Sequence, residues 1–199
     1  RRLDEGFLPR KGPNSNERLR VGWKAVSKAV GFDVHVPEGE SWRVAIYYLH
    51  WKGGYTPRSW MQPRVLDRDT GEVLLEPACR SAGIDSYFVF EVRGDVRIEF
   101  PSNWNRGQVS GLFIDAVPAD QAAVTETPGA KYLGPDYETE GDWPGKYGGV
   151  AYLLPDGSQG GAIDRVKLLD IKETEPLKWP DGVRQYSYRK FPILPSGNY

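Results

Sequence analysis

Three observations predict an all-β fold, a sandwich of the jelly-roll type, for this sequence. Its 23 glycines and 16 prolines, about a fifth of the 199 residues, divide it into short segments. Those segments are rich in β-branched and aromatic residues, and several alternate apolar with polar side chains. They recur at roughly regular spacing between turn sequences, which is typical of sandwiches and barrels rather than of helical folds.

The longest of these segments, residues 41–51, is predicted to be a central strand, because it contains neither glycine nor proline. One set of alternate positions is Trp42, Val44, Ile46 and Tyr48, and the other is Arg43, Ala45, Tyr47 and Leu49. Both sets include apolar side chains. We therefore expect one face of this strand in the core and the other face partly covered.

The segments around it are predicted to be its partner strands. Residues 1–16 are polar and turn-rich, which suggests a surface arm, and residues 17–29 are ambiguous between strand and helix, with strand favoured. The turn sequence at residues 68–71 indicates a hairpin. The remaining predicted strands are residues 31–36, 63–67, 72–75, 86–92, 95–100 and 109–115.

A change of composition at Pro118 divides the chain into three predicted parts. Residues 1–118 are expected to form the body of the sandwich and residues 119–137 a linker or short helix. Residues 138–199 contain C-terminal strands, predicted at residues 150–154, 163–169 and 183–188. Two or three strands are too few for a core of their own, so they must complete this sandwich or a neighbouring one.

Charge and cysteine content exclude several classes of protein. The net charge is −1, and the basic residues are dispersed among acidic ones, so nothing indicates a nucleic-acid-binding face. No apolar run is long enough to insert into a membrane. The single cysteine, Cys79, excludes an internal disulfide framework and is expected to be a small buried or half-buried side chain.

Catalytic motifs are absent from the sequence, and we expect a protein that is not an enzyme. His35 and His50 lie in or at the end of predicted strands, without a nucleophile motif nearby. Calcium is the one cofactor that the sequence suggests, through Asp67 and Asp69. The same two residues also suit a hairpin turn.

Aromatic residues in or beside predicted loops are the candidate binding residues. Sugar rings stack on such side chains, while neighbouring amide and guanidinium groups can hydrogen-bond sugar hydroxyls. Tryptophan, tyrosine and arginine also anchor protein–protein contacts. A third interpretation is that Trp51 and Trp60 pack under the glycine-containing loop between them. The candidate ligand-binding residues are Trp51, Tyr55, Trp60, Asn103, Trp104 and Arg106, whereas Trp23, Trp42 and Trp143 are assigned to the core.

Several segments together resemble a galactose-binding-like β-sandwich repeated in large secreted bacterial proteins. Residues 32–36, 42–51 and 65–67 resemble its middle strands, and residues 95–98 with 109–115 resemble its closing strands. The family's opening motif, Gly-Asx/Ser-Trp-x-Gly-x-Tyr-Gly, resembles Gly141-Asp142-Trp143-Pro144-Gly145-Lys146-Tyr147-Gly148. In this chain the motif follows the closing strands instead of preceding them.

Three arrangements would produce this displaced order. The domain is circularly permuted, or the chain is a cut through a tandem array, or each chain donates its C-terminal strands to the next subunit. The third would build a head-to-tail filament or surface array from copies of the chain, with Trp143, Tyr147 and Tyr152 at the contact.

The resemblance implies an extracellular or cell-surface protein of bacterial type with a structural or adhesive function. We take self-assembly through the C-terminal strands as the leading hypothesis, with copies of the chain as partners. The alternative is a carbohydrate-binding module of a secreted glycan-active protein, with polysaccharide as its partner. This sandwich hosts both roles, so the fold does not separate them.

Overall fold

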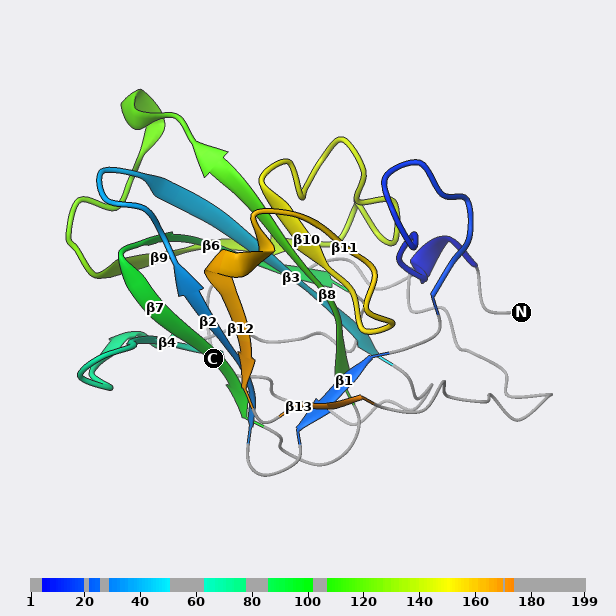
Figure 1. Ribbon diagram of the computed structural model, residues 1–199, viewed down its shortest axis with the longest axis horizontal. Helices are drawn as coiled ribbons and strands as arrows, with labels where there is room; N and C mark the ends of the chain where they lie inside the picture. Colours follow the sequence, from blue (N-terminus) through cyan, green and yellow to red (C-terminus); the bar gives the residue numbers. More distant parts are fainter. Residues whose placement is uncertain are drawn as a thin grey trace, which may run out of the picture.

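The computed structural model describes residues 5–19, 22–25, 29–50, 63–77, 86–101, 107–169 and 171–173. Two antiparallel sheets lie face to face in these ranges, which confirms the predicted all-β sandwich (Figure 1). Short 3-10 helices occur at η1 (Glu5–Phe7), η2 (Ala119–Gln121) and η3 (Ile163–Arg165). The strands are β1 (Trp23–Ala25), β2 (Ala29–His35), β3 (Ser41–His50), β4 (Arg64–Asp67), β5 (Val73–Leu75), β6 (Ser86–Arg93), β7 (Asp95–Pro101), β8 (Gly107–Val117), β9 (Gly129–Asp136), β10 (Ala151–Leu153), β11 (Gln159–Gly161), β12 (Val166–Leu169) and β13 (Ile171–Glu173).

The larger sheet has the strand order β11-β10-β8-β3-β6-β9, and the smaller has the order β12-β2-β7-β4-β5. Strand β1 pairs with both β8 and β13, and these pairings add β1 and β13 to the larger sheet as a branch from β8. From β2 to β8 the chain crosses between the sheets at every connection except the β4–β5 hairpin. This alternation gives the jelly-roll-like arrangement that the sequence predicted.

The central strand β3 confirms the prediction for its two faces. Trp42, Val44, Ile46 and Tyr48 are buried in the core between the sheets, with Phe32, Phe90 and Ile98 among their neighbours in that cluster. Ala45 and Tyr47, on the opposite face, are also fully buried, in a second apolar cluster outside the larger sheet. The larger sheet is therefore covered on both faces.

Residues 119–137 differ from the predicted linker. They contain η2 and then β9, which pairs antiparallel with β6. Glycine and proline lower strand propensity, and β9 contains Gly129, Gly134 and Pro135. An edge strand tolerates them, and β9 has a bulge at Leu133, because the consecutive residues Val89 and Phe90 of β6 pair with Gly134 and Tyr132.

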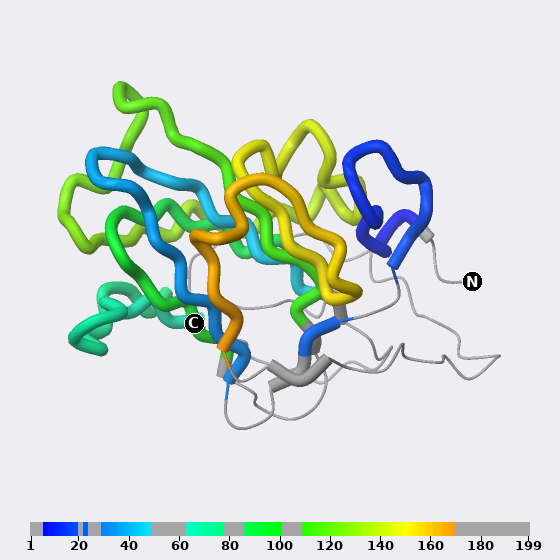
Figure 2. Tube along the Cα trace, in the orientation of Figure 1, coloured from blue at the N-terminus to red at the C-terminus, as the bar shows by residue number. Residues whose placement is uncertain are grey.

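The C-terminal strands complete the sandwich of their own chain. β9 lies beside β6, β10 beside β8, and β12 beside β2. Figure 2 shows the orange segment that contains β12 alongside the blue β2. The predicted strand at residues 163–169 begins as η3 and continues as β12, whereas the predicted strand at residues 183–188 and Cys79 lie outside the described residues.

Two valines on neighbouring strands provide a matched test of this packing. Val65 on β4 is fully buried in the core, whereas Val73 on β5 is 46% exposed. We expect Val65→Ala to lower the free energy of unfolding by about 2 kcal/mol, because the buried site loses methyl contacts and leaves a cavity. The same change at Val73 should cost less than about 0.5 kcal/mol. Urea unfolding of both variants measures the difference, and equal effects would contradict the described core.

Candidate functional site: the covered outer face of the larger sheet

The outer face of the larger sheet carries an apolar cluster that two segments cover. We call residues 5–19 the N-terminal arm and residues 137–150, which connect β9 to β10, the cap loop. In Figure 1 the blue arm lies beside the yellow-green cap loop. The buried members of the cluster are Leu8, Leu19, Ala45, Tyr47, Tyr87, Val89, Phe113, Trp143, Tyr147 and Leu154.

Aromatic rings form a continuous layer in this cluster. Tyr47 stacks on Tyr87 with ring centroids 4.5 Å apart, and the Tyr147 ring centroid lies 4.8 Å from that of Tyr87. Trp143 is 4.8 Å from Phe113 and 4.9 Å from Tyr152. The predicted assembly residues Trp143, Tyr147 and Tyr152 are therefore brought together, and Trp143 and Tyr147 are buried within their own chain at 1% and 6% exposure.

The polar atoms of these rings find acceptors on the covering segments. The Tyr47 hydroxyl donates to the Phe7 carbonyl at 2.6 Å, and the Trp143 Nε1 donates to the Arg10 carbonyl at 2.8 Å. The Tyr87 hydroxyl donates to the Glu140 carbonyl at 2.5 Å. Buried polar groups need such partners, so the rings fix the path of both segments.

An acidic residue in the cap loop joins it to the arm by charge. Asp142 Oδ1 accepts from Arg10 Nε at 2.8 Å and from an Arg18 terminal nitrogen at 2.6 Å. Partial burial alone would raise the pKa of Asp142, but hydrogen bonds from Arg10 and Arg18 lower the pKa below its ordinary value. The Asp142 side chain is 53% exposed, so each pair is a modest contribution.

A second carboxylate, Asp136, holds the cap loop where it leaves β9. It accepts from the Thr139 hydroxyl, from the backbone amides of Glu138 and Thr139, and from the Tyr147 hydroxyl at 2.7 Å. Burial opposes its ionisation, but these hydrogen bonds outweigh burial and lower the pKa of Asp136. Burial raises the pKa of both Tyr87 and Tyr147, and the charge of Asp136 raises each further, so these hydroxyls remain protonated donors.

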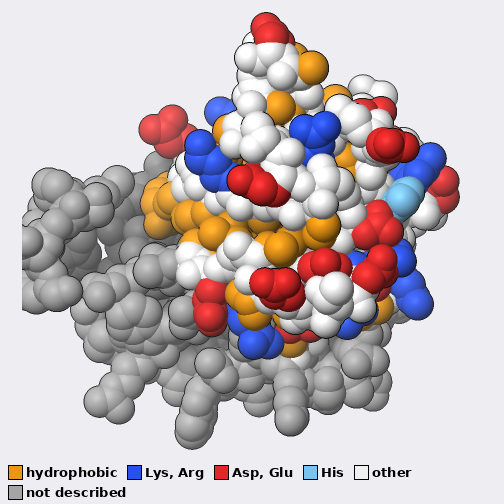
Figure 3. Space-filling view, turned by 90° about the vertical axis from the view of Figure 1, so that its left-hand side faces the viewer, with side chains coloured by type: hydrophobic (Ala, Val, Ile, Leu, Met, Phe, Trp, Pro, Cys, Tyr) orange, Lys and Arg blue, Asp and Glu red, His pale blue; other side chains and the backbone are white. Residues whose placement is uncertain are grey.

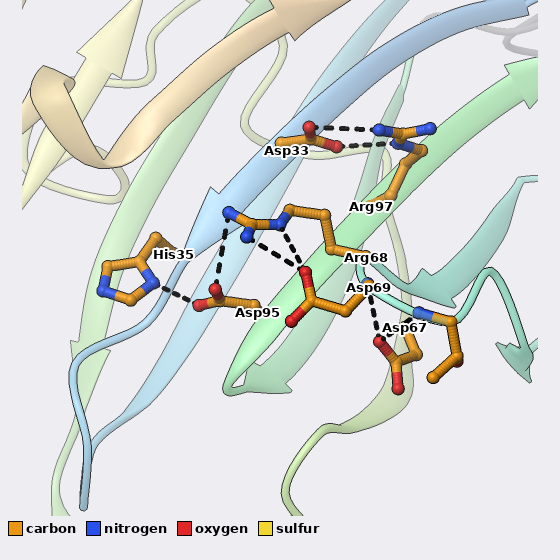
Figure 4. A network of polar contacts seen from close by, with 8 residues as sticks. Asp33, His35, Asp67, Arg68, Asp69, Asp95 and Arg97 are labelled. Carbon is orange, nitrogen blue, oxygen red and sulfur yellow. Dashed lines mark hydrogen bonds and ion pairs between the residues drawn. The ribbon is translucent and has the colours of Figure 1, made fainter.

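The outer face of the smaller sheet carries charged side chains, whereas the outer face of the larger sheet carries the aromatic layer. Figure 4 shows its paired side chains, with Arg97 bound to both oxygens of Asp33 at 2.7 and 3.2 Å. Asp95 contacts both His35 and Arg68. His35 is thus an exposed strand residue whose ring is paired with the Asp95 carboxylate.

The two aspartates suggested as calcium ligands have other partners in the hairpin turn. Asp67 Oδ1 accepts from the backbone amides of Asp69 and Thr70, which lowers the pKa of Asp67, and Asp69 pairs with Arg68. Over the described ranges, no group of three histidine, cysteine, aspartate or glutamate side chains is arranged to hold a metal.

The predicted ligand-binding residues Trp51, Tyr55, Trp60, Asn103, Trp104 and Arg106 lie outside the described residues. They belong to two connections, one that follows β3 and one that precedes β8, and the end of β3 lies next to the start of β8. His50, which ends β3, is the register partner of Gly107, which begins β8.

Sequence reasoning did not identify the arm, the Asp142 ion pairs or the buried Tyr47–Tyr87 stack as a site. The sequence did contain one indication, the apolar side chains on the second face of β3. They predict that this face is buried, but they do not indicate which segment buries it.

Comparisons with protein-family models, with curated proteins and with solved structures find no match for this chain. In the described part, no helix has the length and apolar character needed to cross a membrane.

The contribution of the Asp136 charge to the stability of the cap loop can be tested by measuring unfolding at different pH values. Since its pKa is lower in the folded chain, its stabilisation is present above about pH 4 and is lost as the pH falls through the folded-state value. We expect Asp136→Asn to lower the free energy of unfolding by about 2 kcal/mol at pH 7, because hydrogen bonds to a charged acceptor are lost. Chemical unfolding between pH 7 and pH 2 should show this difference shrinking.

The matched control is Asp164→Asn, since the Asp164 side chain is 80% exposed. Its unfolding curve should follow that of the wild type at every pH. A difference between Asp136→Asn and the wild type that stays constant down to pH 2 would contradict the role given to the Asp136 charge.

Proposed function

We propose that the protein is a non-catalytic structural or adhesive module that associates with copies of itself by exchanging its C-terminal strands. One observation carries the proposal. In the described strand orders, strands after residue 128 supply the outermost position at three of the four sheet edges: β9, the β10–β11 hairpin and β12. A body that depends on these strands accepts them equally from its own chain or from a neighbour.

The cost of leaving those edges open favours this interpretation. Without the later strands, β6, β8 and β2 would each present unpaired backbone groups, and such edges invite pairing with another chain. Exchange would keep every pairing while changing which chain provides it. Association by this route therefore needs no new contact surface.

A surface feature adds support for contact between copies. On the side where β9, β4 and β5 lie, Figure 3 shows a band of apolar side chains with charged side chains around it. Among the described residues, Val73 on β5 and Leu133 on β9 are the large hydrophobic side chains most exposed, at 46% and 42%. Exposed apolar patches are typical of protein–protein contacts.

The carbohydrate-binding alternative depends on residues outside the described ranges and stays a prediction from the sequence. The same holds for an extracellular or cell-surface location, which the family resemblance implies.

An engineered disulfide tests which chain provides β12. Gly31 on β2 is the register partner of Leu169 on β12, and a Cβ at Gly31 would lie 3.4 Å from the Leu169 Cβ. This separation is close to the roughly 3.5–4.5 Å found in disulfides. We expect the Gly31→Cys/Leu169→Cys variant, with Cys79→Ser to remove the native cysteine, to oxidise into covalently linked dimers and larger species.

Non-reducing electrophoresis and light scattering provide the readout, and Gly31→Cys/Cys79→Ser alone controls for random cross-linking. Quantitative formation of the disulfide within monomers would contradict strand exchange and leave a circularly permuted, self-contained module. The carbohydrate-binding alternative would then be tested by retention on immobilised polysaccharide.

A further inference from the structure

Residues 6–10 of the N-terminal arm lie against the cap loop and are held mainly through their backbone. The Gly141 amide donates to the Gly6 carbonyl at 2.9 Å, and the Arg10 amide donates to the Gly141 carbonyl at 3.1 Å. Tyr47 and Trp143 bind the carbonyls of Phe7 and Arg10, as described above. Four hydrogen bonds thus bind the main chain of the arm rather than its side chains.

Gly141 allows the close approach that these hydrogen bonds need. A Cβ at this position would lie 2.0 Å from the Leu8 carbonyl oxygen and 2.7 Å from the Gly6 carbonyl oxygen. The three heavy atoms nearest to that Cβ all belong to the arm. An alanine at position 141 would therefore collide first with the arm, before it met the body of the protein.

Side chains of the arm add an apolar anchor and a charged end. Leu8 is 1% exposed and lies in the same cluster as Tyr47 and Trp143. Arg10 pairs with Asp142, and Arg18 bridges the two segments by bonding both Asp142 and the Leu8 carbonyl at 2.9 Å. Backbone hydrogen bonds combined with burial of particular side chains are a recurring way in which proteins recognise peptide segments.

We propose that the cap loop and the outer face of the larger sheet form a binding site for a peptide segment, here called the groove, and that residues 5–10 of a second copy can occupy it in place of the chain's own arm. The arm's own sequence, Glu5-Gly6-Phe7-Leu8-Pro9-Arg10, is the ligand to which the groove is complementary. This contact exchanges the N-terminal arm, a different segment from the C-terminal strands of the proposed function.

Two full-length variants separate the groove from its occupant. Leu8→Asp places a charge in the apolar cluster, so the chain's own arm is released and the groove is left free. Gly141→Ala blocks the groove while the arm keeps its sequence. In the double variant, arm and groove are both disabled.

The first measurement is fluorescence anisotropy with a labelled synthetic peptide of residues 5–12. We expect the peptide to bind the Leu8→Asp chain and to bind the double variant at least about tenfold more weakly, a difference of roughly 1.4 kcal/mol. A peptide carrying Leu8→Asp is the matched control and should not bind. Equal binding by the single and double variants would overturn the groove.

The second measurement tests whether a copy of the chain is an occupant. Unlabelled Gly141→Ala chain, whose arm is intact and released, should displace the labelled peptide from the Leu8→Asp chain. The double variant should not displace it. Failure of the Gly141→Ala chain to compete, when the peptide itself binds, would overturn arm exchange. The disulfide test on β12 reports on strand exchange separately.

Hydrogen exchange of the wild-type chain keeps the proposal testable if Leu8→Asp does not fold. The Arg10 amide, which is bonded to Gly141, should exchange through local opening of the arm and therefore faster than the amides of β3. Arg10 protection equal to that of β3 would show that the arm leaves its groove only on global unfolding. That result would overturn the proposal.

Discussion

Apolar side chains on both faces of the larger sheet are the constraint on which the rest of the structure depends. A two-layer sandwich buries one face of each sheet, yet β3 carries Tyr47 and Ala45 on its outer face, and β8 adds Phe113 there. An aromatic side chain buries about 150–250 Å², so several of them exposed together would cost several kcal/mol. The chain meets this requirement with a partial third layer, made from the N-terminal arm and the cap loop.

The third layer is held by hydrogen bonds that the aromatic rings require. Each buried hydroxyl or indole nitrogen must find an acceptor, and Tyr47, Tyr87 and Trp143 find theirs on backbone carbonyls of the two covering segments. Apolar burial thus gives the layer its stability, and the polar atoms of the same rings give it a defined position. The surface ion pairs of Asp142 add less, because they are partly solvated.

Local pattern predicted most strands of the body, including both faces of β3. It failed where tertiary structure overrides local preference. Residues 129–136 have turn-like composition but form β9 because the edge of β6 is available to pair. The arm has the composition of a surface segment, yet Leu8 is buried at 1% exposure in a cluster with Tyr47 and Trp143, which lie about 40 and 135 positions away in the sequence. The alternation of apolar and polar residues along a single sequence carries no information about contacts between such distant positions.

The pairing of β1 with β13 has a consequence for how the chain folds. Trp23 is the register partner of Glu173, so this contact joins segments roughly 150 residues apart in the sequence and raises the contact order of the fold. The edges of β6, β8 and β2 likewise stay unpaired until the later strands have been synthesised. Folding is therefore expected to be slow and to finish after the body has left the ribosome, with exposed sheet edges during that interval. The delay leaves the newly made chain prone to pairing with other chains at these open edges.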